Sequence, residues 1–322
     1  MKRREFIKRT GQIAVGGLIT NSLAGCIRRD DIFYPSLDNG ITWSNYQLSV
    51  NIASEGTNDV NGAEEPCVIK DSSTYKMWYA GLNGGIYRII YCESSDGVNW
   101  SNFRTVINVG ASGTGFDSTY ANFPAVIKDG STYRMWYAGN DGTNNRTIYC
   151  ESTDGITWSN FQLAVNIGSE GTNDTNSAIG CAVIKENGTY KMWYAGNGGS
   201  WRILYCTSSD GINWSNFQLV INLSSQGTYD TNAAFWPVVI KENGSYKMWY
   251  TGNAINERTI YCTSLNRITW SNFQLSVDIN SVGTFDTNLV SHPWVINDNG
   301  TGKMWYSGFD GTNFRIIYAE SR

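Results

Sequence analysis

One short segment occurs five times in the sequence, and this repetition limits the folds open to the chain. The segment reads YKMWYAG at 75–81 and returns with small changes at 133–139, 190–196, 246–252 and 302–308. Its tryptophans are 58, 57, 56 and 56 residues apart. A fixed period of this length indicates a chain built from stacked copies of one supersecondary unit.

Each repeat predicts four strands. In the second copy they are 124–129, 132–140, 146–152 and 156–165, with the turn sequence TDG between the last two. These segments are rich in Val, Ile, Tyr, Trp and Thr, and no stretch after the first 26 residues has a helical period. In YKMWYAG both faces of the strand carry large apolar side chains, so both faces of each sheet must be covered.

The two ends of the chain predict how the repeats close. The C-terminal RIIYAESR reads as a third strand without a fourth, whereas residues 38–50 read as a fourth strand without a third. The sequence therefore predicts an all-β, five-bladed β-propeller of four-stranded antiparallel blades. The N-terminal segment supplies the outer strand of the last blade and closes the ring.

The first residues have the pattern of an export signal. A basic start containing Arg3 and Arg4 precedes a short apolar stretch and the sequence LAGC, which ends at Cys26. The arginine pair resembles a twin-arginine signal, and LAGC resembles a lipoprotein cleavage site. An ordinary secretory leader with an incidental cysteine is the alternative. The expected organisation is a signal peptide over 1–25, a lipidated N-terminus and linker over 26–37, and one propeller domain over 38–322.

The charge and the cysteine content limit the kinds of partner and ligand that the chain is expected to bind. Five of the 24 basic residues and one of the 28 acidic residues lie in the first 26 positions, which leaves a net charge of −8. An acidic chain without basic runs argues against nucleic acid as a partner. Membrane contact is expected only through the lipid anchor, at the bacterial cell envelope. The six other cysteines have no metal-ligand spacing and read as buried apolar residues. No feature specifies oligomerisation or a cofactor, so a monomer is expected.

The repeated motifs PxVI, MWYxG and SxDGxxW resemble the five-bladed propeller glycosidases, a superfamily that includes arabinanases, levansucrases and invertases. The resemblance implies a funnel at the top of the ring and three carboxylates, one at the start of the innermost strand in each of the first three blades. The matching positions hold Glu65 in blade one, Asn122 and Phe123 in blade two, and Ile179 and Gly180 in blade three. Two of the three expected carboxylates are therefore missing, although glycoside hydrolysis normally needs a pair.

The five copies stop agreeing just before the innermost strands, and we expect function there. These positions hold Glu64-Glu65, Asn122-Phe123, Ile179-Gly180, Phe235-Trp236 and Ser291-His292. Aromatic rings with carboxyl and amide groups around one axis suit a sugar site. Candidate sugar-binding residues are Tyr120, Asn122, Phe123, Phe235, Trp236, Ser291 and His292. Phe123 and Phe235 are alternatively a plug. His292 is either a pore residue or, by the resemblance, a neighbour of a central calcium ion.

Glu65 is the leading catalytic candidate, with Glu64 as an alternate and Asp117 as a partner. Adjacent buried carboxyls repel each other, which raises a pKa. Asp117 belongs to a set of aspartates that recurs in every copy, as does an arginine at the start of each third strand. These repeated residues have two interpretations. Either each arginine pairs with an aspartate and the role is structural, or the aspartates and arginines form an anion or sugar site on the rim.

Two functions remain open. The first is a carbohydrate-active enzyme, a glycoside hydrolase or, by the resemblance, a phosphorylase. The second is a non-catalytic glycan-binding or scaffold lipoprotein. Two carboxyls across an open funnel would favour the enzyme, whereas closure of the funnel by Phe235 and Trp236 would favour the second.

Overall fold

The computed structural model describes residues 40–321, and these residues form β-strands and no helix. Consecutive strands pair antiparallel in groups of four, which we call units one to five. Unit one comprises β2 (Gly62–Asp71), β3 (Thr74–Asn83), β4 (Ile86–Ser94) and β5 (Ser101–Ile107). Unit two comprises β6 (Tyr120–Asp129), β7 (Thr132–Asn140), β8 (Asn145–Ser152) and β9 (Ser159–Val165).

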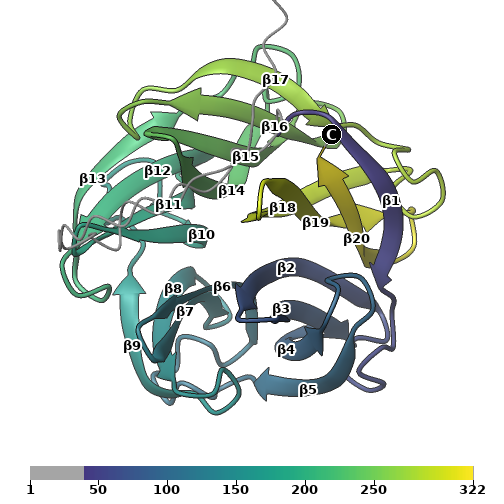
Figure 1. The fold of residues 1–322 in the computed structure, drawn as a ribbon. Helices are drawn as coiled ribbons and strands as arrows, with labels where there is room; N and C mark the ends of the chain where they lie inside the picture. Colours follow the sequence, from purple (N-terminus) through teal and green to yellow (C-terminus); the bar gives the residue numbers. More distant parts are fainter. Residues whose placement is uncertain (1–39, 322) are drawn as a thin grey trace, which may run out of the picture. The chain divides into compact units, whose positions relative to one another are not determined.

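The remaining units repeat the same order. Unit three comprises β10 (Ser177–Glu186), β11 (Thr189–Asn197), β12 (Trp201–Ser208) and β13 (Trp214–Ile221). Unit four comprises β14 (Ala233–Glu242), β15 (Ser245–Asn253), β16 (Glu257–Ser264) and β17 (Ser271–Val277). Unit five comprises β18 (Leu289–Asp298), β19 (Thr301–Phe309), β20 (Phe314–Ser321) and β1 (Trp43–Val50). Figure 1 shows the first strand of each unit innermost. The predicted all-β, propeller-type architecture is confirmed.

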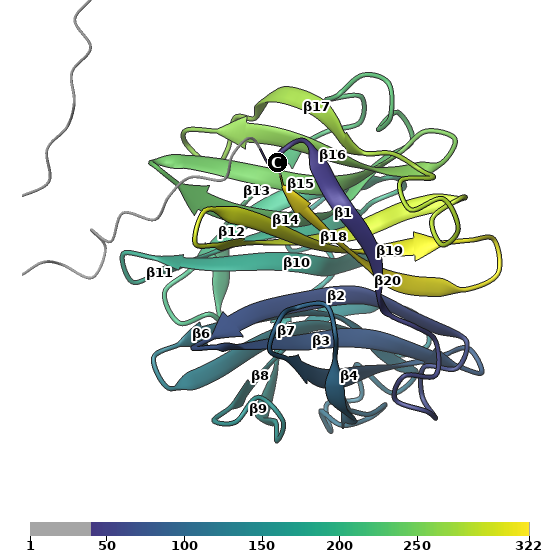
Figure 2. The same cartoon turned by 45° about the vertical axis from the view of Figure 1, so that its right-hand side comes forward.

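The N-terminal strand completes the last unit. β1 pairs antiparallel with β20, and both views show the two strands side by side (Figures 1 and 2). Arg315 on β20 donates to Asn51 at 2.9 Å, just after β1. Arg88 of unit one donates in the same way to Asn108, just after its own fourth strand. The N-terminal segment therefore occupies the place of a fourth strand, with the contact that a fourth strand makes.

The repeated tryptophan packs each unit against the next. Its indole N–H donates to a backbone carbonyl in the turn before the neighbouring fourth strand, at 2.7–3.2 Å. The five donor–acceptor pairs are Trp78–Gly155, Trp136–Gly211, Trp193–Arg267, Trp249–Gly40 and Trp305–Gly97. All five tryptophans are fully buried. The repeated segment is thus apolar on both faces because each unit is packed between two others.

Ion pairs also join neighbouring units, at the C-terminal ends of the first strands. Lys128 of unit two binds Asp71 of unit one at 2.6 Å, and Lys70 of unit one binds Asp298 of unit five at 2.6 Å. These pairs are partly exposed, so each adds little to stability. The predicted roles of the cysteines and turn glycines are confirmed: the six described cysteines are buried and unpaired, and Gly97 has a φ of 84°.

The predicted strands differ from the structure mainly at the first strand. β6 begins at Tyr120 rather than at residue 124, and every first strand contains a β-bulge. The bulge adds one residue to the first strand, and in unit two this strand extends to the N-terminal side of Pro124. The positions that were predicted to precede the strand therefore belong to it.

The predicted signal peptide (1–25), the lipidated linker (26–37) with Cys26, and the export residues Arg3 and Arg4 lie outside the described residues. Within the described chain, no helix is long and apolar enough to cross a membrane.

Candidate functional site

The bulges place one residue from every unit at the centre. The bulged residues are Glu65, Phe123, Gly180, Trp236 and His292, and all five have φ between 50° and 62°. Left-handed backbone costs about 1 kcal/mol or more for residues other than glycine, so the surrounding structure must hold it in place. The bulged positions are where the sequence repeats disagree. The fold therefore places four different side chains and a glycine around one axis.

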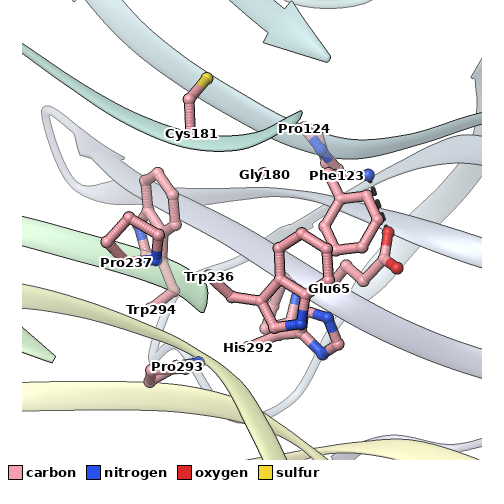
Figure 3. Close-up of a pocket in the computed structure, with 11 residues that line it drawn as sticks. Glu65, Phe123, Pro124, Gly180, Cys181, Trp236, Pro237, His292, Pro293 and Trp294 are labelled. Atoms are coloured by element: carbon pink, nitrogen blue, oxygen red, sulfur yellow. Dashed lines mark hydrogen bonds between the residues drawn. The ribbon is translucent and has the colours of Figure 1, made fainter. Parts of the chain in front are cut away.

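Three of these side chains form a stacked cluster across the centre, in which the rings of Phe123 and His292 also contact each other, with centroids 5.2 Å apart at 48°. The ring centroids of Phe123 and Trp236 are 4.1 Å apart at 27°, and those of Trp236 and His292 are 5.2 Å apart at 25°. The stack leaves a cavity of about 30 Å³, lined also by Glu65 and Gly180 (Figure 3). A cavity of this size has room for a water molecule or two and not for a sugar ring.

Gly180 is the small member of the ring because Trp236 occupies its side-chain space. A Cβ built on Gly180 would lie 2.2 Å from an atom of the indole ring. Phe235 is 5% exposed and packs edge-on against Trp236, with centroids 5.0 Å apart. Trp201, at the start of β12, packs on the same indole at 5.1 Å. The aromatic plug is therefore built from units two, four and five and supported by unit three.

Glu65 is buried and bound by its neighbours. Its carboxylate accepts from the backbone N–H of Phe123 at 2.7 Å and from the amide of Asn122 at 3.3 Å. Burial, followed by the charge of Glu64, raises the pKa of Glu65 well above its ordinary value. The predicted coupling of the two carboxyls is thus present, and together with burial it favours the protonated form of Glu65.

Glu64, in unit one, interacts with the carboxyl group of Glu257, in unit four. The hydroxyl of Tyr87 donates to Glu64 at 3.1 Å. Burial raises the pKa of Glu64 to about 8, and the charge of Glu257 on β16 adds to the rise. Burial raises the pKa of Glu257 to about 7, against a hydrogen bond with Ser291. Glu257 is therefore a third acidic residue of the site, and it keeps part of its surface exposed.

Sequence reasoning missed Glu257 because it sought variation only before the first strands. A second variable position precedes the repeated arginine at the start of every third strand: Tyr87, Asn145, Trp201, Glu257 and Phe314. Four of these contact the candidate residues, since Asn145 accepts from the hydroxyl of Tyr120 and Trp201 packs on Trp236. The same comparison between copies, applied at this position, would have found Glu257.

The plug residue His292 contacts the side chain of Ser291. Ser291 is fully buried, and its hydroxyl is 2.8 Å from His292 Nδ1. Burial lowers the pKa of His292 to about 3, so its ring is neutral. Within residues 40–321, no group of three or more His, Cys, Asp or Glu side chains could hold a metal ion. A central calcium ion beside His292 therefore does not fit these residues.

Asp117 is not brought into the site. It is fully buried in its loop, where it accepts from the hydroxyl of Tyr137 at 2.8 Å and from the backbone N–H of Ser112 at 3.0 Å. The equivalent aspartate of every other unit binds the equivalent tyrosine at 2.8 Å: Asp59–Tyr79, Asp174–Tyr194, Asp230–Tyr250 and Asp286–Tyr306. The predicted pairing of these aspartates with the repeated arginines is wrong, because the aspartates bind tyrosine. The arginines bind residues just after the fourth strand, and Arg146 and Arg315 also pair with Asp141 and Asp310, between the second and third strands.

Exchanging Asp117 for asparagine is expected to lower the free energy of unfolding by about 1–3 kcal/mol, because an amide replaces a charged acceptor of several N–H and O–H groups. Asp174→Asn, in the equivalent place of unit three, should cost the same within about 1 kcal/mol. Chemical denaturation measures both. A loss for Asp117→Asn in glycan binding or turnover, without one for Asp174→Asn, would return Asp117 to the site.

No protein-family model matches this chain. The uncharacterized proteins MT1551 and Rv1502, from two strains of Mycobacterium tuberculosis, are each 33% identical to it over 140 residues, which is 41% of this chain and 46% of each relative. The chain therefore spans about half the length of the curated relatives it matches.

Solved structures resemble most of this chain. One described as an RGII complex of BT0996 has a TM-score of 0.69 at 16% identity, and the match covers 85% of this chain and 91% of the other. An exo-1,5-α-L-arabinanase from a bovine ruminal metagenomic library has a TM-score of 0.62 at 14% identity, covering 80% and 92%. A third, described with the GH130 mannoside phosphorylases and their β-1,2-mannoside hydrolases, has 0.65 at 12%, covering 89% and 96%. The chain has a glycoside hydrolase-like propeller fold.

Proposed function

We propose that this chain is a non-catalytic glycan-binding protein, and that its ligand lies at the end of the ring where the first strands begin. The observation that carries the proposal is the Phe123–Trp236–His292 stack, which closes the funnel of a glycoside hydrolase-like fold. A glycosidase must admit a sugar ring between its carboxyl groups and leave room for the attacking water. The cavity of about 30 Å³ admits no sugar.

The residues around the plug suit binding at the surface. Three aromatic residues beside the plug are half-buried rather than buried: Tyr87, Tyr120 and Trp201. Exposed ring faces stack on the CH groups of sugars, and the neighbouring carboxyl and amide groups accept hydroxyl protons. The fold neighbours that act on glycans, and the one described as an RGII complex, support the same ligand class.

The proposal also covers architecture and location. The cycle of five tryptophan hydrogen bonds supports a closed five-bladed ring. The N-terminal sequence supports export and a diacylglycerol anchor on Cys26, which would hold a monomeric protein at the bacterial cell envelope.

Hydrolysis is the second candidate, and one observation favours it. Glu64 and Glu257 come from units one and four, and the charge of Glu257 acts on Glu64. Two carboxyls from different units are the arrangement that glycosidases use. In this candidate Glu64 and Glu257 form the pair, in place of the predicted Glu65 with Asp117 as its partner.

The test is a glycan array followed by titration calorimetry and product analysis. Wild-type protein is expected to bind a set of glycans and release no product from them. Tyr120→Ala should weaken binding about tenfold, the value of one aromatic contact of about 1.4 kcal/mol. Leu265→Ala, at a residue that is 84% exposed outside the site, is the control and should bind normally. Product release abolished by Glu257→Gln would establish the second candidate instead.

A further inference from the structure

The charges at the C-terminal end of the first strand are balanced in unit one. Asp71 ends this strand and faces two cations, Lys76 of its own unit at 3.7 Å and Lys128 of unit two at 2.6 Å. Glu93 lies opposite Lys76 on the third strand, so two carboxylates accompany the two cations. The hydroxyl of Tyr91 donates to Glu93 at 2.5 Å. The formal charge of this group is therefore zero.

Units two, four and five keep the same balance. Unit four lacks one member of each sign, because Asn297 stands in place of the lysine and Thr263 in place of the glutamate. Lys247 and Glu242 remain there, 2.8 Å apart. The complete groups are Asp129, Arg134, Lys185 and Glu151 in unit two, and Asp298, Lys303, Lys70 and Glu320 in unit five.

Unit three carries a surplus of two positive charges at the same place. Thr207 replaces the glutamate opposite Lys191. Arg267, in the turn of unit four that packs against unit three, replaces a glycine and has a φ of 78°. Lys191, Lys241 and Arg267 all pair with Glu186, Arg267 at 3.7 Å and the two lysines more closely. Burial, followed by the charges of Arg267 and Lys241, lowers the pKa of Lys191 to about 8, which reflects the repulsion among cations that share one carboxylate.

A hollow of about 360 Å³ lies at this surplus charge. Volumes of roughly 300–1,000 Å³ are typical of sites for small molecules. The side chain of Lys191 is only 6% exposed, so its charge is partly shielded from water. Hydroxyl and amide groups beside the cations can donate hydrogen bonds to a ligand. The lining includes Lys191, Arg267, Asn187, Thr189, Tyr205 and Thr207.

Tyr205 gives a second, independent indication of an anion. The tyrosine in its place donates to a glutamate two residues later in units one, two and five. Tyr205 is 4% exposed, and the residue two positions later is Thr207, which has no carboxylate. An anion in the hollow would supply the acceptor that the equivalent tyrosines have.

We propose that the hollow between units three and four binds a phosphate group with two negative charges, either free or as a monoester. Such a group carries close to two negative charges at pH 7 and has three strong acceptor oxygens, which match the surplus charge and the donors of the lining. Hydrogen bonds from Arg267 and Lys191 to phosphate are charge-assisted and therefore strong. A sulfate ester or a carboxylate has one charge and leaves the other cation uncompensated. The site lies at the end of the first strands away from the aromatic plug, so the inference goes beyond the proposed function and does not depend on it.

The test compares ligands that share one sugar. We would titrate the purified protein calorimetrically at pH 7 with glucose 6-phosphate, glucose 6-sulfate and glucose, which differ in the charge of the group on carbon 6. Glucose 6-phosphate is expected to bind at least tenfold more tightly than the other two. Inorganic phosphate, titrated by itself, measures the affinity of the group without the sugar.

Two substitutions restore the residues that other units hold, so the fold should tolerate them. Arg267→Gly removes the additional cation, and its positive φ suits glycine. Thr207→Glu returns the carboxylate opposite Lys191. Each is expected to weaken the binding of glucose 6-phosphate at least tenfold, because it removes one of the two surplus charges. Lys76→Gln removes a lysine from the equivalent place in unit one and should change this affinity less than about twofold.

The outcomes divide clearly. Absence of phosphate binding, equal affinity for glucose 6-phosphate and glucose 6-sulfate, or an affinity that survives both Arg267→Gly and Thr207→Glu overturns the inference. A loss in Lys76→Gln as large as that in Arg267→Gly shows a response to net charge alone and overturns it too. Equal affinities for inorganic phosphate and glucose 6-phosphate uphold the site and assign it to free phosphate. Tighter binding of glucose 6-phosphate upholds the site and assigns it to a phosphorylated sugar.

Discussion

Replacing Gly180 with alanine is expected to lower the free energy of unfolding by about 3 kcal/mol. Two costs combine. The residue has a φ of +62°, where alanine is disfavoured by about 1 kcal/mol relative to glycine. The new methyl would also lie 2.2 Å from the ring of Trp236, and forcing extra atoms into a packed site costs about 1–3 kcal/mol. Urea denaturation of both proteins measures the difference.

A matched control and a double mutant separate the two costs. Gly188 has a φ of +76° and no atom within 4 Å of a built Cβ, so Gly188→Ala should show the backbone cost alone. In a Trp236→Ala background, Gly180→Ala should cost only the same backbone amount, since the ring is gone. Equal costs for Gly180→Ala in both backgrounds would show that Trp236 does not fill this space, and the closed funnel would be wrong.

Stability is expected to fall between pH 4.5 and pH 8 and to recover in Glu64→Gln. The folded-state pKa of Glu64 is about 8, above its ordinary 4.5, so the folded protein holds a proton that the unfolded chain releases. The stabilisation is complete below pH 4.5 and is lost as the pH rises toward 8. The loss is roughly 4–5 kcal/mol for this group, at about 1.4 kcal/mol for each pKa unit. The glutamine side chain is neutral at every pH, so the variant should be the more stable protein at pH 8.

The pH experiment has its own control. Glu93 has a pKa lowered by a hydrogen bond from Tyr91, so Glu93→Gln should bring no recovery at pH 8. Denaturation midpoints at pH 5, 6.5 and 8 for the three proteins give the comparison. Wild-type stability that does not change over this range would contradict the buried, uncompensated cluster.

Much of the fold follows from the repeat alone. β7 spans the nine residues expected of a second strand, because a strand that is apolar on both faces is unambiguous when five copies agree. β1 takes the predicted place of a missing fourth strand. The first strands were predicted too short because the sequence does not indicate the bulge. Glu65 and Trp236 occupy it at positive φ, and nothing in these two residue types predicts that conformation.

The site was predicted in part. The disagreement between copies located Glu64, Glu65, Asn122, Trp236 and His292, which the structure does bring together. It did not show that Trp236 reaches across the centre to Phe123 and His292, since this depends on packing between residues more than fifty positions apart. The Asp117–Tyr137 pair was missed for a related reason. The repeated aspartates were matched to the repeated arginines by charge, whereas burial gives the carboxylate a tyrosine hydroxyl.

A glycoside hydrolase-like propeller with a closed funnel is expected to bind a glycan without cleaving it, whereas an active site cleaves the glycan that it binds. The decisive measurement is mass spectrometry of a glycan that the protein binds, after prolonged incubation with wild-type protein and with Glu257→Gln. We expect an intact glycan in both samples, with binding retained by the wild type. Cleavage by the wild type that is absent in Glu257→Gln would show instead that the protein is a glycosidase.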